Sequence, residues 1–305
     1  MKEHKAPHYL KNLINSDPDF VAIVENLIAN ETQNPLKLDE KDYQVAILSA
    51  CIGVGGLDLF KKILADCVKD CVLSILEIRE LVYQSQAYTG LTNSYSFVKE
   101  LSKFIGKNEI KLPKEPKEDL AVDNQERRLA KDQKIQEILF GKLSVVEENA
   151  LKYELDKLIK ANCYGDFFSR KNLSLRLREL SAFSILVAMG QCGKQLQAHI
   201  IANYVAGNEY AELIKVVSAI IPFVGYVKAS NALDVLINVN KQETKKEPKS
   251  KDSKVESPTS KEKADKHIVS KNVVKQEQKE SKDVKATASS NNNQVAKVLK
   301  KKTKR

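Results

Sequence analysis

The sequence predicts an all-α protein, and three observations support this prediction. In the first 240 residues, apolar side chains recur at spacings of three and four, the period of one face of an α-helix. The alternation of apolar and polar residues that marks a half-buried strand is hard to find there. Asp39, Ser74 and Asn93 stand directly before apolar runs, where their side chains can cap helix N-termini.

The predicted helices fall into two groups on either side of a linker. Residues 107–124 contain Pro113 and Pro116 among many Lys and Glu residues, a composition typical of a connection rather than a helix. The helical pattern covers residues 19–27, 45–52, 59–68, 75–88 and 95–105 before this linker, and residues 125–140, 145–161, 175–189, 195–205, 210–221 and 229–239 after it.

The two groups are copies of one pattern. A shift of 135 residues, without a gap, superimposes them, and it carries Gly55 onto Gly190 and Gly90 onto Gly225. We interpret this as an internal duplication, because a run of ungapped matches is not expected by chance. Further matched pairs are Leu38 and Leu173, Lys41 and Arg176, Ser49 and Ser184, Glu77 and Glu212, Val82 and Val217, Tyr88 and Phe223, and Leu101 and Leu236.

The positive charge of the chain lies in its C-terminal segment. Residues 241–305 hold 20 basic and 9 acidic residues, whereas the first 240 residues hold 30 and 31. The segment lacks aromatic residues, so it cannot bury enough apolar surface to order itself, and we predict a disordered tail. Its lysines favour at most weak contacts with nucleic acid or anionic surfaces, and the near-neutral body argues against a nucleic-acid-binding protein.

The sequence favours a cytoplasmic protein. No uncharged apolar run reaches the length that spans a bilayer, and the first residues lack the apolar core of a signal peptide. The five cysteines are odd in number and irregularly spaced, which is typical of free thiols in a reducing compartment. No phosphate-binding or dinucleotide fingerprint is present, and no metal-ligand spacing is complete, so we predict neither cofactor nor metal.

The candidate site lies in the second copy. Cys192, Gln195 and His199 follow one another at spacings of three and four, so they share one face of a predicted helix. Cys192 stands near the start of that helix, where the helix dipole can lower the pKa of a thiol. The first copy has Leu57, Phe60 and Leu64 at the three matching positions. Packing alone therefore accepts apolar residues there, which favours a functional role for the polar set.

The second copy resembles the carboxymuconolactone decarboxylase and alkylhydroperoxidase D-like superfamily. The resemblance rests on residues 164–180, an aromatic turn followed by a Leu- and Arg-rich run, on Gln195 with His199, on the Gly207–Asn208 turn, and on residues 222–225. Residues 80–90 show the same skeleton in the first copy, so the resemblance covers residues 36–240 and is strongest for tandem members.

The resemblance implies an all-α fold that assembles into trimers or hexamers. It also implies a site in which Cys192 and His199 match the first Cys and the His of the alkylhydroperoxidase D motif, with Glu179 as the upstream acid, one residue further away than in that branch. Gln195 replaces the second Cys of that motif, and it also replaces the Glu of the lactone decarboxylase motif. The chain thus departs from both branches at one position.

Three functions remain open at this stage. The first is a thiol-dependent, peroxiredoxin-like redox enzyme that acts through Cys192, His199, Gln195 and Glu179. The second is a cofactor-free decarboxylase or isomerase of a lactone or keto acid that uses His199 as acid and base. The third is a non-catalytic helical binding protein. The predicted organisation is a lead-in at 1–35, a first repeat at 36–106, the linker at 107–124, a second repeat with its lead-in helices at 125–240, and the tail at 241–305.

Overall fold

The computed structural model describes residues 8–33, 35–113, 124–140 and 150–246. Within these ranges every regular element is a helix, which confirms the all-α prediction. None of the helices in these ranges is long and apolar enough to cross a lipid bilayer. Residues 114–123 of the predicted linker and residues 247–305 of the predicted tail lie outside the described residues, whereas the last helix continues past position 241 to Lys246.

The helices follow the same order in both halves of the chain. The first half contains η1 (His8–Leu13), α1 (Pro18–Asn26), the π-helix η2 (Leu27–Gln33), α2 (Glu40–Val54), α3 (Leu57–Lys69), α4 (Ile75–Gln84) and α5 (Gln86–Lys107). The second half contains α6 (Gln125–Phe140), α7 (Ala150–Ile159), the π-helix η4 (Lys160–Phe168), α8 (Leu175–Met189), α9 (Gly193–Val205), α10 (Tyr210–Val224) and α11 (Tyr226–Lys246).

Capping residues explain where the central helices begin. The Asp39 side chain accepts hydrogen bonds from the backbone of Lys41 and Asp42 at the start of α2. Ser74 and Glu77 form a capping box on α4, and Glu209 and Glu212 form the matching box on α10. Of the predicted caps only Asn93 is wrong. It lies inside α5, beyond a kink at Gly90, and its side chain donates to the carbonyl of Ile52 at 2.8 Å.

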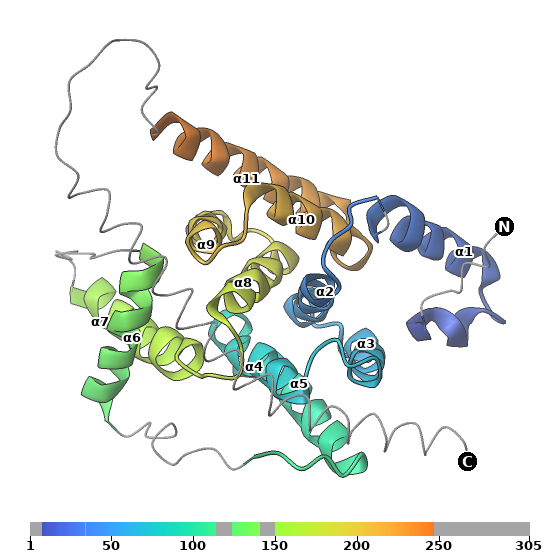
Figure 1. Ribbon diagram of the computed structural model, residues 1–305, viewed down its shortest axis with the longest axis horizontal. Helices are drawn as coiled ribbons and strands as arrows, with labels where there is room; N and C mark the ends of the chain where they lie inside the picture. Colours follow the sequence, from blue (N-terminus) through green and yellow to red (C-terminus); the bar gives the residue numbers. More distant parts are fainter. Residues whose placement is uncertain (1–7, 34, 114–123, 141–149, 247–305) are drawn as a thin grey trace, which may run out of the picture.

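Helices α2 and α8 lie side by side at the centre of the molecule, surrounded by the other helices (Figure 1). Every residue from Val45 to Ile52 and from Leu177 to Ala188 is buried, as expected for helices covered on all sides. The two backbones approach closely at Gly53, where a Cβ atom would lie 2.6 Å from the Cβ of Ala188. The Ser49 hydroxyl donates to Ser181 across the same interface at 2.8 Å. The two halves therefore share one core.

The helices of the two halves correspond under the 135-residue shift found in the sequence. It carries α2 onto α8, α3 onto α9, α4 onto α10 and α5 onto α11, and it overlaps the π-helix η2 with η4. Gly90 and Gly225 both have positive φ, with ψ values of 168° and 160°, conformations that favour glycine. The lead-in helices lie at opposite ends of the molecule, with α1 at one end and α6 and α7 at the other (Figure 1).

A buried ionic cluster joins α4 of the first half to α8 of the second. The Arg178 guanidinium is fully buried and donates to Glu80 at 3.1 Å and to Gln84 at 3.2 Å. Glu80 also accepts from Arg170 at 2.8 Å, and these two cations lower the pKa of its carboxyl group in spite of its burial. Because removing one member would leave a buried charge without a partner, this cluster fixes how the two halves meet.

Candidate functional site

The centre of the candidate site is an acid–histidine pair between two neighbouring helices of the second half. Glu179 lies on the buried helix α8 and His199 on α9, and Nδ1 of the imidazole is 2.7 Å from Oε2 of the carboxylate. Glu179 is 0 % exposed and His199 is 8 % exposed, so water is almost excluded from the pair. Because an ionised carboxylate only accepts hydrogen bonds, this contact orients a neutral imidazole with its proton on Nδ1 and with Nε2 as the acceptor nitrogen.

Tyr88 of the first half completes this arrangement. Its hydroxyl lies 3.5 Å from Nε2 of His199, and the two rings meet edge to face with centroids 5.4 Å apart. Burial raises the pKa of Tyr88 well above its ordinary value, and the neighbouring Cys163 and Glu179 add to the rise. The phenol is therefore protonated at neutral pH, and its hydroxyl lies near both Nε2 of His199 and the side chain of Cys163.

The second carboxylate oxygen of Glu179 is buried without a hydrogen-bond partner in the part of the chain that the structure describes. An unpaired buried acceptor costs free energy that a structural Glu–His pair would not require.

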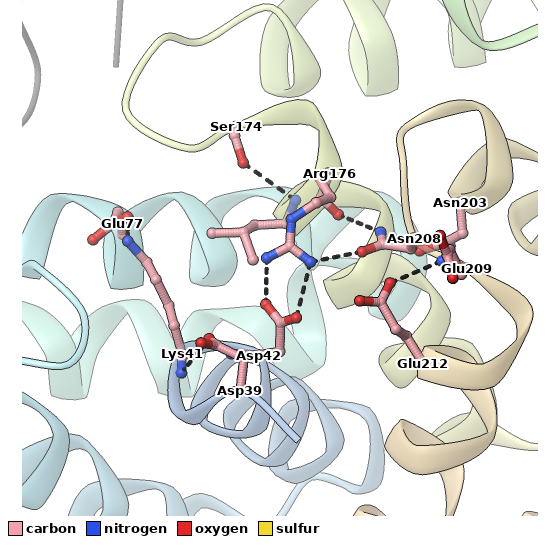
Figure 2. Close-up of polar contacts among 11 residues, drawn as sticks. Asp39, Lys41, Asp42, Glu77, Ser174, Arg176, Asn203, Asn208, Glu209 and Glu212 are labelled. Carbon is pink, nitrogen blue, oxygen red and sulfur yellow. Dashed lines mark hydrogen bonds and ion pairs between the residues drawn. The ribbon is translucent and has the colours of Figure 1, made fainter. Parts of the chain in front are cut away.

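A polar network holds the backbones of the two site helices together. The Asn203 side chain on α9 donates to the carbonyl oxygen of Glu179 at 3.0 Å and to that of His199 at 2.6 Å. The side-chain amide oxygen of Asn203 accepts a hydrogen bond from the side-chain amide of Asn208 at 2.8 Å. Figure 2 shows Arg176 between Asn208 and the carboxylate of Asp42, which comes from the first half. The register of α8 and α9, and with it the Glu179–His199 geometry, is therefore fixed from both halves.

The other two predicted site residues are not part of this pair. Cys192 precedes the first residue of α9, and its thiol donates to the carbonyl of Gly190 at 3.0 Å. Burial raises the pKa of the Cys192 thiol, which is opposite to the lowering expected from its position near the helix start. Gln195 is exposed on the outer face of α9. Of the four predicted residues, the structure thus brings only Glu179 and His199 into contact.

Sequence reasoning missed three contributors to the site. Tyr88 and Asp42 reach it from the first half, and Asn203 acts on backbone atoms, so no local motif contains them. One signal was present for Tyr88: the matching position of the second half is Phe223, so the hydroxyl is the difference between the copies.

The side chains of the site are suited to acid–base chemistry. Across the described ranges, no group of three or more His, Cys, Asp or Glu residues is placed to hold a metal ion. The five cysteines are all free thiols, and Cys51, Cys67 and Cys163 are buried. In this site His199 can accept a proton, Glu179 orients the imidazole of His199, and Tyr88 supplies a neutral hydroxyl group.

Comparison with known proteins agrees with this part of the molecule. Residues 153–238 match the model of the carboxymuconolactone decarboxylase family, and this segment contains Glu179, Cys192, Gln195 and His199. The match does not extend to the first half, and no curated protein matches the chain. The helices that carry Glu179 and His199 are thus similar to the carboxymuconolactone decarboxylase family, which supports the resemblance of the second half to that superfamily.

Proposed function

We propose that this protein is a cofactor-free acid–base enzyme that acts on a small lactone or keto acid, with His199 as the proton acceptor and donor. The single observation that carries this proposal is the buried Glu179–His199 contact of 2.7 Å, which leaves Nε2 basic. The family match over residues 153–238 adds support from an independent direction.

The proposed step moves one proton and one electron pair. For an isomerisation, Nε2 of His199 takes the proton from the carbon beside the carbonyl group, and the C–H electron pair moves into the enolate. The imidazolium, stabilised by Glu179, then returns the proton to another carbon. For a decarboxylation, Nε2 of His199 first takes the proton of the substrate's carboxyl group, the C–C bond to the carboxylate then breaks, carbon dioxide leaves, and the imidazolium returns the proton to the enolate carbon. Tyr88 donates to the enolate oxygen, where charge develops.

The test is proton exchange and carbon dioxide release on a panel of γ-lactones and β-keto acids in deuterium oxide, followed by NMR. We expect activity in the wild type and in Cys192→Ser, and loss in His199→Gln and Glu179→Gln with the helical spectrum retained. Activity that survives in His199→Gln would contradict the proposal. The absence of activity on any member of the panel, with tight binding of one, would support the third function, a helical binding protein.

A thiol-dependent redox function is the second candidate. It is favoured by the position of Cys192, which is partly exposed at the start of the helix that carries His199, unlike the buried Cys51 and Cys67. Its thiolate would attack a peroxide oxygen, release water or an alcohol, and leave a sulfenic acid that an external thiol reduces. Peroxide reduction that is lost in Cys192→Ser but kept in Glu179→Gln would favour this function over the acid–base one.

We also propose that the first half is a second, degenerate copy of the same fold and that the protein assembles into trimers or hexamers. The helix order repeats in both halves, and the lead-in helices expose matching apolar residues, Phe20 and Ile23 on α1 and Leu155 and Leu158 on α7. Burying such faces between subunits is a common cause of assembly. Light scattering at micromolar concentration tests this, and a monomer would contradict it. Free thiols favour a cytoplasmic location.

A further inference from the structure

A cavity of about 620 Å³ lies in the first half, where η1, α1 and η2 cover α3 and the end of α10. Leu13, Val24, Ile28, Leu59 and Phe223 contribute apolar atoms to its wall. Its volume is in the range of ordinary small-molecule sites, and its wall is mostly apolar, as such sites usually are.

The cavity corresponds to the Tyr88 side of the candidate active site. The 135-residue shift carries Phe223 back onto Tyr88 and Ile28 onto Cys163, the residue beside Tyr88. It also carries Leu59 of the cavity wall onto Lys194 at the start of α9. The cavity is therefore the counterpart of the surroundings of Tyr88, and Leu64, the counterpart of His199, is not part of its wall.

The chemical groups of the active site are missing from this counterpart. Leu64 stands where the second half has His199, and Gln44 stands where it has Glu179. Leu64 is fully buried in the core, so the position holds neither a proton acceptor nor the acid that would orient one. Phe223 lacks the hydroxyl of Tyr88, and its ring packs 6.3 Å from that of Tyr9.

The two lysines of the cavity wall are already engaged. The Lys62 ammonium donates to the backbone carbonyl of Tyr9 and to the side chain of Asn12. Lys61 pairs with Asp58 at 3.1 Å and approaches Glu100 at 4.0 Å. A ligand that relied on these cations would have to break existing contacts, so the cavity favours an uncharged molecule.

We propose that this cavity binds a neutral, largely apolar small molecule of one or two rings without transforming it. The space is ligand-sized, its wall is mostly apolar, and its lysines are engaged by groups of the protein itself. This inference rests on the geometry of the first half and not on the activity proposed for His199.

The experiment is a fluorescence titration of the full-length protein with N-phenyl-1-naphthylamine, a neutral probe that brightens in apolar surroundings. We expect saturable binding with one probe per chain. Leu59→Lys, which introduces the residue of the matching position in the second half, should weaken binding at least about tenfold, because it places a charge in the apolar wall. Val24→Trp, which fills the space without a charge, should weaken it as well.

Matched variants in the second half are the control. Lys194→Ala alters the exposed counterpart of Leu59, and His199→Ala removes the proposed catalytic base, so both should bind the probe with unchanged affinity. Circular dichroism verifies that each variant is folded. Absence of saturable binding, or binding that folded Leu59→Lys and Val24→Trp leave unchanged, would overturn the proposal. Release of the probe as the protein concentration rises would also overturn the proposal, because it would mean that a second copy of the chain fills the cavity.

Discussion

The two halves of this protein place different chemistry on the same set of helices. The polar residues Glu179, His199, Asn203 and Asn208 of the second half correspond to Gln44, Leu64, Val68 and Leu73 of the first. All four second-half residues are buried. Hydrogen bonds join Glu179 to His199, Asn203 to the backbone carbonyl of Glu179, and Asn208 to Asn203. Three of the four first-half residues are core hydrophobics. The comparison teaches that packing accepts apolar residues at three of these four positions, so packing alone does not require the polar set.

The largest expected effect is the loss of turnover on substitution of His199, which substitution of its counterpart Leu64 should not cause. His199→Ala should lower turnover by about 100- to 10,000-fold, the usual contribution of a general acid–base group, and it should also lower the free energy of unfolding, because the buried Glu179 loses its partner. Leu64→Ala should leave turnover per folded molecule unchanged. It should lower the free energy of unfolding by about 2–5 kcal/mol, because it opens a hole in a packed core. Steady-state kinetics and urea unfolding on both variants measure the two effects, and the reverse pattern would contradict the account.

The next largest effect is expected at Asn203, whose counterpart in the first half is Val68. Asn203→Val should remove two hydrogen bonds to the carbonyls of Glu179 and His199 and leave Asn208 with an unpaired amide hydrogen. We expect a loss of roughly 1–3 kcal/mol in the free energy of unfolding. We also expect a lower kcat with little change in KM, since the pair that transfers the proton loses its register. Val68→Ala is the matched control, and an equal fall of kcat there would show that Asn203 has no positioning role.

The sequence predicted the fold more completely than it predicted the site. Helix periodicity and the capping residues Asp39 and Ser74 are local signals, so the all-α fold and most helix positions could be predicted. One helix start was predicted at the wrong place, because α5 bends at Gly90. The positive φ of this residue does not change the spacing of the apolar residues, so the sequence pattern does not reveal the bend. Spacing placed Cys192 on one face with His199, but the helix begins only at Gly193. The contacts of Tyr88 and Asp42 arise from tertiary packing, which spacing does not encode.

Tyr88 allows a smaller test, since its counterpart is Phe223. Tyr88→Phe removes only the hydroxyl that faces Nε2 of His199, so turnover should fall up to roughly tenfold, the value of one hydrogen bond in the transition state. Because burial raises the pKa of Tyr88, the hydroxyl stays protonated across neutral pH, and the defect should be constant between pH 6 and about pH 9. A defect that disappears on going from pH 6 to pH 9 would show that the phenol does not act as a donor.

The cysteines distinguish the halves under alkaline conditions. Burial raises the pKa of Cys51 to about 12, and the counterpart of Cys51 in the second half is Leu186. The unfolded chain therefore loses the thiol proton first, so stability falls as pH rises from about 9 towards 12. Cys51→Ala should lower the melting temperature at pH 7 but make its further decline above pH 9 less steep. Thermal unfolding followed by circular dichroism checks this, and parallel curves for the two proteins would contradict it.

The smallest expected effect is the alkylation of Cys192. Because burial raises the pKa of this thiol, labelling by iodoacetamide should increase with pH up to values above the ordinary thiol range, and it should be slower than labelling of the exposed Cys71. Mass spectrometry after brief labelling between pH 6 and 10 measures both sites. Fast labelling of Cys192 at pH 6 would instead support the redox function.

The central claim is that Glu179 fixes the imidazole of His199 with the proton on Nδ1 and a free electron pair on Nε2. Nitrogen-15 NMR of histidine-labelled protein at pH 8 observes this directly, because the chain has only four histidines and His199→Gln identifies the signal. The account predicts an Nδ1–H tautomer for His199 in the wild type and a mixture of tautomers in Glu179→Gln. An Nε2–H tautomer in the wild type, or spectra that are identical in the two proteins, would contradict it.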